Sequence, residues 1–319
     1  MHLQSLRLAL LIVFVAYPAS HVAADNWPAW RGPQGTGHAN ETKLPLTWSA
    51  TENVKWKVEL PDEGNSTPIV WGDRVLITQA EDEGRQRSLI CFNRADGKQL
   101  WIRSVRYEEP ESTHRTNPYC SSSPVTDGKR IFVWHGSAGF FAYDFDGQEL
   151  WSKDLGKFQH VWGNASSPIL RDGKVILHAG PGENNFLVAL DPASGEELWR
   201  NSDLFDPSRR GAKPGSWSTP VVYRDGDRDL LLLSVPFELA AFDPQDGSKV
   251  WSCDGLTQLV YTSPLVGKGL AVGMSGYGGA AIAARTGGSG NVTESHRLWR
   301  HERNPQRVGS GIIVDDHIY

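Results

Sequence analysis

The sequence is poor in sulfur: its 319 residues include three cysteines and two methionines. Cys91, Cys120 and Cys253 are neither adjacent nor at C-x-x-C spacing, so they form no metal-binding or redox motif. An odd number of cysteines leaves at least one thiol unpaired. We expect buried free thiols, and the sequence leaves open one disulfide without indicating its pair.

The sequence also lacks an apolar run long enough to span a bilayer, which takes ~20 apolar residues. The run Leu8–Ala16 is about half that length; it follows Arg7 and is followed by Val22-Ala23-Ala24. This order is typical of a cleaved secretory signal. We predict a signal peptide over residues 1–24, cleaved after Ala24, and a periplasmic or secreted mature protein with no membrane span.

The net charge of −5 comes from interspersed acids and bases, and no basic patch suits nucleic acid. The sequence has no zinc-binding His pair, G-x-S-x-G elbow or Walker loop. Gly276–Ala281 spells G-x-G-x-x-A without a helix to follow, and Asp225–Asp229 resembles a calcium loop, but Leu230 replaces its glycine. We interpret both as strand connections and predict no metal site.

Glycine, proline and tryptophan are abundant, with 33, 19 and 13 residues, a mix that favours short strands and tight turns. One short pattern, Ser-x-Pro or Thr-x-Pro followed by apolar residues, recurs five times. Each copy precedes a turn and another apolar run, as in a β-hairpin. The copies begin at Ser66, Ser122, Ser166, Ser218 and Thr262.

Each repeat closes with a glycine-containing turn and a tryptophan. A repeat of roughly 45–50 residues with four short strands and no helical periodicity indicates a β-propeller blade. The sequence therefore predicts an all-β propeller of four-stranded antiparallel blades. We expect the tryptophans to fill the wedges between blades as structural docking residues: Trp101, Trp151, Trp199, Trp251 and Trp299, with Trp56 ahead of the first.

Ala189–Trp199 and Ala241–Trp251 both read A-x-D-x-x-x-G-x-x-x-W, which resembles the tryptophan-docking repeat of quinoprotein alcohol dehydrogenases. The opening Trp27–Pro33 resembles the start of secreted bacterial propellers of this group. The resemblance implies a pyrroloquinoline-quinone-like (PQQ-like) propeller over residues 25–319. Such propellers usually have eight blades; here we expect five complete blades and parts of others, as in a C-terminally truncated fragment.

Segments between each tryptophan and the next Ser-x-Pro vary in length, and variable loops mark the working face of a propeller. Residues just before each Ser-x-Pro should therefore lie at the mouth of the central channel. Aromatic and hydrogen-bonding side chains there would suit a ligand, and the same side chains could simply plug the channel. The candidate ligand-binding residues are Asn117, Tyr119, His160, Trp162, Trp217, Tyr261 and Arg307, with His114 and Arg115 in a charged rim loop.

The resemblance implies that catalytic relatives have adjacent cysteines, a calcium ion held by Glu, Asn and Asp, and an Asp base, none of which can be placed here. Without catalytic residues to assign, we expect a non-catalytic scaffold, with no cofactor, that binds an unknown protein, small molecule or carbohydrate. The alternative is a PQQ-dependent alcohol or sugar dehydrogenase, for which the resemblance implies PQQ and calcium. A third hypothesis, carbohydrate binding or processing, depends on Trp162, Trp217 and Tyr261.

Overall fold

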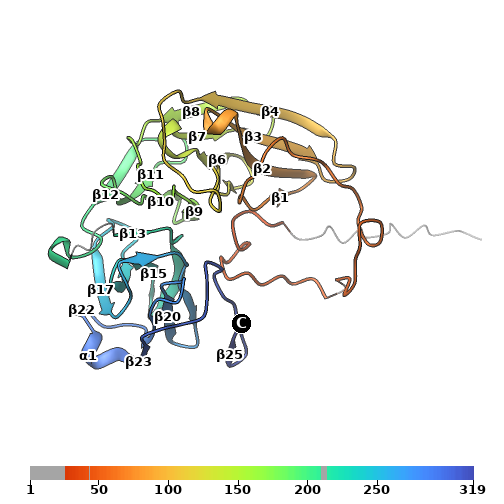
Figure 1. Ribbon diagram of the computed structural model, residues 1–319. Helices are drawn as coiled ribbons and strands as arrows, with labels where there is room; N and C mark the ends of the chain where they lie inside the picture. Colours follow the sequence, from red (N-terminus) through yellow and green to blue (C-terminus); the bar gives the residue numbers. More distant parts are fainter. Residues whose placement is uncertain (1–25, 43, 210–213) are drawn as a thin grey trace, which may run out of the picture.

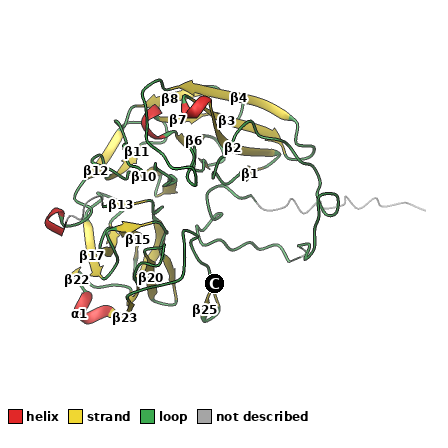
Figure 2. Cartoon of the chain, viewed as in Figure 1, coloured by secondary structure: helices red, strands yellow, loops and turns green. Residues whose placement is uncertain are grey.

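The computed structural model describes residues 26–42, 44–209 and 214–319, so the predicted signal peptide lies outside the described residues. Helix in the described part is limited to α1 (Thr293–His296) and three single 3-10 turns, Asp82–Gly84, Gly136–Ala138 and Pro207–Arg209. No helix in these ranges is long and apolar enough to cross a membrane. Figure 2 shows that strands and their connections make up nearly all of the fold.

Five sheets, each with four consecutive antiparallel strands, follow one another along the chain, and we number them blades 1 to 5; the sheet of blade 4 gains a fifth strand described below. Blade 1 contains β1 (Ile69–Trp71), β2 (Arg74–Glu81), β3 (Gln86–Asn93) and β4 (Gln99–Arg106). Blade 2 contains β5 (Val125–Thr126), β6 (Ile131–Trp134), β7 (Phe140–Tyr143) and β8 (Glu149–Lys153). Blade 3 contains β9 (Ile169–Arg171), β10 (Lys174–Ala179), β11 (Phe186–Leu190) and β12 (Glu197–Asn201).

Blade 4 contains β14 (Val221–Asp225), β15 (Arg228–Val235), β16 (Glu238–Phe242) and β17 (Lys249–Asp254). Blade 5 contains β19 (Leu265–Gly267), β20 (Leu270–Met274), β21 (Ala281–Arg285) and β23 (Arg297–His301). The blades succeed one another around a common centre in chain order (Figure 1). The prediction of a β-propeller built from four-stranded blades is confirmed.

Three short pairings lie outside this pattern. β13 (Gly215–Ser216) runs parallel to β18 (Leu259–Val260), and β22 (Gly290–Asn291) runs parallel to the outer strand of blade 4. β24 (Ile313–Val314) and β25 (His317–Ile318) form a hairpin after blade 5, where the sequence predicts the start of a sixth repeat.

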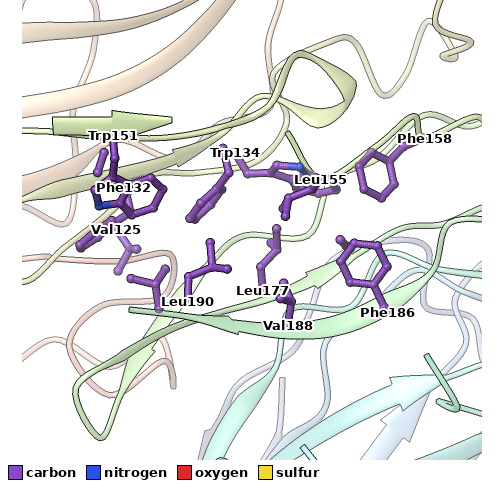
Figure 3. Close-up of a cluster of buried hydrophobic side chains, with 14 residues drawn as sticks. Val125, Phe132, Trp134, Trp151, Leu155, Phe158, Leu177, Phe186, Val188 and Leu190 are labelled. Carbon is purple, nitrogen blue, oxygen red and sulfur yellow. The ribbon is translucent and has the colours of Figure 1, made fainter. Parts of the chain in front are cut away.

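Apolar side chains fill the spaces between blades, because neighbouring sheets pack face to face. Figure 3 shows the cluster between blades 2 and 3, in which Phe132 and Trp134 face Leu177 and Val188. Phe158, from the connection between these blades, meets the Trp134 ring edge-on at 5.3 Å. Burying each of these large side chains contributes about 1.5–3 kcal/mol.

The outer-strand tryptophans Trp151 and Trp199 each contact the following blade. The indole N–H of Trp151 donates to the Pro192 carbonyl of the next blade at 3.0 Å, and its ring lies against Gly195. Trp199 donates in the same way to Pro244 at 3.1 Å. Gly195 has a φ of +72°, and a β-carbon there would lie 2.7 Å from the Trp151 ring. Both the turn and the docked ring therefore require glycine at this position.

Trp101 docks on the carbonyl of Phe145 at 3.0 Å, and Trp56 docks on the carbonyl of Arg94 in blade 1 at 2.9 Å. The segment around Trp56 therefore lies against blade 1 in the position that the outer strand of the preceding blade occupies next to blades 2, 3 and 4.

The last two tryptophans depart from this geometry. Trp251 is fully buried but donates to the Tyr223 hydroxyl of its own blade at 2.8 Å, because the next blade carries an insertion that includes β22 and Val292. Trp299 is 38% exposed, so the structure does not place it as a buried wedge. Trp101, Trp151 and Trp199 thus share one hydrogen bond to the next blade, whereas Trp251 is buried between blades 4 and 5 without it and Trp299 is partly exposed.

Candidate functional site

The middle residues of the Ser-x-Pro motifs after the first link neighbouring blades through their hydroxyl groups. In each case the hydroxyl oxygen accepts a hydrogen bond from the backbone N–H of the equivalent residue one blade earlier, which ties the inner ends of the blades together. The donor and acceptor residues are Thr67 and Ser123 at 2.9 Å, Ser123 and Ser167 at 2.9 Å, Ser167 and Thr219 at 3.0 Å, Thr219 and Ser263 at 2.8 Å, and Ser263 and Ser310 at 3.0 Å.

We call these six residues the hydroxyl chain. Ser310 occupies the position that the middle residue of a sixth Ser-x-Pro would take, although its neighbours are glycines. The sequence identified the repeated motif but did not assign a role to its middle residue.

The N-terminal segment crosses the inner ends of the blades. Trp27 pairs with Val70 of β1, and the Pro28 carbonyl accepts from the N–H of Thr126 in β5 at 2.9 Å. Further along, the guanidinium of Arg31 donates to the carbonyls of Ser310 and Gly311 at 3.1 and 2.6 Å. The segment therefore connects blades 1 and 2 to the residues that follow blade 5.

A pocket with a cavity volume of about 450 Å³ lies between this segment and the loops that lead into the inner strands. Its size falls within the range of small-molecule sites. Four of the seven predicted ligand-binding residues line it: Asn117, Trp162, Trp217 and Tyr261. The remaining lining residues are Trp30, Arg31, Asn65, Thr116, Ser121, Ala165, Ser167, Thr219, Ser263, Tyr277, Val308, Gly309 and Ser310.

The residue directly before each Ser-x-Pro lines the pocket in all five repeats, and Val308 takes the same position before Gly309-Ser310-Gly311. Four residues of the hydroxyl chain, two positions further along, line it as well. Side chains two apart in an extended chain point to the same side, which explains this pattern. Asn65, Ser121 and Ala165 could have been predicted from the sequence, because each directly precedes a Ser-x-Pro motif.

Trp217 and Tyr261 form one wall of the pocket. The parallel pairing of Ser216 with Val260 places them side by side, and the Trp217 N–H donates to the Val260 carbonyl at 3.0 Å. Their rings stack with centroids 4.8 Å apart and planes 10° apart, and Tyr277 meets Tyr261 edge-on.

Trp162 belongs to the loop before blade 3. His114, from the predicted rim loop, packs on its ring with centroids 4.4 Å apart, and Asn117 Nδ2 donates to its carbonyl oxygen at 2.7 Å. The indole N–H of Trp217 donates to the carbonyl of Gly163 in the same loop at 2.8 Å. Hydrogen bonds between loops thus hold the aromatic side chains in place.

The other predicted residues do not line this pocket. Tyr119 turns toward Arg87, and its hydroxyl donates to the Glu111 carbonyl at 2.7 Å, because Cys120 has a φ of +60° and interrupts the alternation of side chains. His160 is buried behind Trp217, ring edge to face at 5.0 Å. The Arg307 guanidinium lies over the Tyr277 ring. Arg115 is exposed on the rim loop.

A buried ion pair anchors the rim loop, and sequence reasoning missed it. Arg87 Nη1 lies 3.2 Å from Glu111 Oε2, and both side chains are 3% exposed. Glu111 also accepts from the Ser137 N–H at 3.2 Å and from Asn164 Nδ2 at 3.1 Å. The signal that could have found it is an arginine in the apolar strand β3, since a buried charge requires a partner.

Next to this pair lies buried His135, whose carbonyl accepts from Arg87 Nη1 at 2.5 Å. Burial, with a smaller effect of the Arg87 charge, lowers the pKa of His135 to about 3. Its Nδ1 lies 3.6 Å from Cys120 Sγ, and burial raises the pKa of that thiol to about 12. Both groups are therefore neutral at pH 7.

The pocket residues do not fit a calcium ion. Calcium takes oxygen ligands, chiefly carboxylates, and the lining contains neither Asp nor Glu. In the described part of the chain, no three His, Cys, Asp or Glu side chains gather where they could hold a metal ion. Cys91, Cys120 and Cys253 are free and buried.

The family model described as outer membrane protein assembly factor BamB matches residues 44–121 and 120–319. The chain belongs to this PQQ-like repeat family. The resemblance to PQQ-like propellers, inferred from the tryptophan-docking repeats, is thereby confirmed. No curated protein matches the chain significantly.

Solved structures share the fold at low sequence identity. BamB from Moraxella catarrhalis is 14% identical, with a TM-score of 0.57 over 83% of this chain and 71% of BamB. Quinohemoprotein alcohol dehydrogenase from Comamonas testosteroni is 14% identical, with a TM-score of 0.59 over 84% of this chain and 48% of the enzyme. A europium-containing methanol dehydrogenase is 13% identical, with a TM-score of 0.55 over 82% of this chain and 56% of the enzyme. The chain thus spans about half the length of the two dehydrogenases.

Proposed function

We propose that this protein is a non-catalytic, periplasmic or secreted propeller that binds a ligand in the pocket at the channel mouth. The observation that carries the proposal is the lining itself: aromatic side chains, amides and hydroxyl groups surround a cavity of about 450 Å³. Such a combination of apolar surface with a few polar groups is typical of binding sites.

The lining contains no His, Cys, Asp, Glu or Lys side chain, so its serine and threonine hydroxyls have none of the usual general bases beside them to activate them as nucleophiles. This supports binding over catalysis. Kinship with a family described as an outer membrane protein assembly factor supports a binding role in the cell envelope, and the predicted signal peptide supports export.

Thermal unfolding tests the proposal, because a ligand that binds only the folded state raises Tm. The full chain would be heated with neutral sugars, sugar acids and short peptides at millimolar concentrations. We expect at least one class of ligand to raise the Tm of the wild type saturably. Trp48→Ala is the control and should show the same rise, because the Trp48 side chain is 70% exposed and lies outside the pocket lining. Trp162→Ala should abolish the shift.

The proposal fails if no class stabilises the wild type. It also fails if Trp162→Ala responds as strongly as the wild type, because the ligand would then bind elsewhere.

A further inference from the structure

Arg31, from the N-terminal segment, is the one charged residue in the lining of the pocket, and it also lines a neighbouring cavity with Gly35 and Thr36. Arg31 forms no ion pair with any acidic side chain in the described ranges. Four of its five N–H groups donate to backbone carbonyls, those of Gly35, Thr36, Ser310 and Gly311, and one Nη1 proton remains. The site therefore has a net charge of +1 without a counter-charge from the protein.

Burial lowers the pKa of Arg31, yet arginine stays protonated at neutral pH. A half-buried cation without an acidic partner lacks both full hydration and an ion pair. An anionic group on a ligand would supply that partner.

The hydroxyl chain adds further donors beside Arg31. Ser167, Thr219 and Ser263 are almost fully buried, and their oxygens accept from backbone N–H groups. Their own O–H protons donate to no side chain or carbonyl in the described residues, so they are available to acceptor atoms in the pocket. Ligand hydroxyls and carboxylate oxygens both provide such acceptors.

The walls supply apolar surface around these donors, with Trp30, Trp162, Tyr261 and Tyr277 in the lining. A ring that carries hydroxyl groups matches both features, since its C–H bonds can face aromatic rings while its oxygens meet polar groups. The lining holds a single cation, which matches the charge of one carboxylate.

We propose that the pocket binds a sugar acid, a hydroxylated ring with a single carboxylate, whose charge is balanced by Arg31. This inference rests on the proposed binding function and names its ligand class. A site for neutral sugars would not require a cation without an acidic partner, which this pocket has in Arg31.

The test compares D-galacturonate with D-galactose by isothermal titration calorimetry on the full chain. The two probes share a sugar ring, and only the first carries a carboxylate. We expect galacturonate to bind at least tenfold more tightly than galactose, and its advantage to shrink when NaCl is raised from 0.05 to 0.5 M, because salt screens the ion pair. Arg31→Gln should remove the preference, and Arg31→Lys should retain part of it.

Equal affinity for the two sugars would overturn the inference about charge and leave the binding function standing. Failure of both sugars, when a peptide stabilises the protein, would overturn the ligand class. Failure of every probe would overturn the proposed function itself. If Arg31→Gln does not fold, the sugar pair and the salt series on the wild type still decide the inference. Trigalacturonate, titrated alongside, shows whether the ligand is a free sugar acid or the end of a polymer.

Discussion

The indole ring of Trp151, on the outer strand of blade 2, lies against Gly195 of blade 3, where a β-carbon would come within 2.7 Å of the ring. The same contact recurs between Trp199 and Gly247. Blades 2 and 3 are thus each joined to the following blade where an indole ring covers a glycine in a turn.

This contact predicts that Gly195→Ala destabilises the protein by about 3 kcal/mol, the sum of left-handed backbone strain and overpacking. Gly173→Ala is the matched control, because Gly173 has a similar φ of +69° and no atom within 4 Å of the added carbon. The control should cost only about 1 kcal/mol. Urea unfolding of both variants checks the difference, and equal losses would show that the ring contact has no effect.

The hydroxyl chain predicts a sharp difference between two substitutions at Ser167. Ser167→Ala removes the acceptor for the buried N–H of Ser123 and should cost about 1–3 kcal/mol. Ser167→Thr keeps the hydroxyl, as Thr219 does in the next repeat, and should stay within about 1 kcal/mol of the wild type. The free energy of unfolding in urea measures both. A threonine variant as unstable as the alanine variant would contradict the assigned role.

Glu111 is predicted to stabilise the rim loop far more than its neighbour Glu109. Glu111→Gln leaves Arg87 as a buried charge without its partner and should cost about 3–5 kcal/mol. Glu109 pairs with Lys157 at the surface, so Glu109→Gln should cost less than about 1 kcal/mol. Thermal unfolding gives the stabilities, and limited proteolysis reports whether the rim loop opens. Comparable effects of both substitutions would rule out the anchor.

Buried His135 predicts a loss of stability in mild acid. Its pKa is about 3 in the folded protein and about 6.5 in the unfolded chain, so the unfolded state binds more protons between these values. The stabilisation is complete above pH ~6.5 and declines by up to roughly 1.4 kcal/mol per pH unit below it. His135→Gln should flatten the slope between pH 7 and pH 5, whereas exposed His301→Gln should not. An unchanged slope in His135→Gln would contradict the assignment.

Periodic features of the fold could be predicted from the sequence. The Ser-x-Pro copies mark inner strands, and the tryptophan spacing marks outer strands, because the same local physics repeats in every blade. Trp251 lacks the hydrogen bond that Trp151 and Trp199 make to the next blade, because the insertion that contains β22 lies against its strand. The repeat pattern predicts the contacts that the blades share, whereas an insertion in one blade changes the contacts of the adjacent strand.

The pocket was predictable only in part. Trp217 and Tyr261 could be placed because they directly precede a motif whose register is fixed. Tyr119 could not, since the left-handed conformation of Cys120 redirects the chain and nothing in the residue type signals it. Arg31 and Trp30 come from a segment more than a hundred residues away in sequence from most of the lining, and only the fold brings them there.

The central claim is that this propeller binds a ligand without catalysing quinone chemistry. Its most direct test is a titration of the full chain with pyrroloquinoline quinone and calcium, following quinone absorbance and the reduction of a dye by alcohols and sugars. We predict no stoichiometric quinone binding and no dye reduction. Stoichiometric binding with substrate-dependent dye reduction would contradict the claim and establish a dehydrogenase.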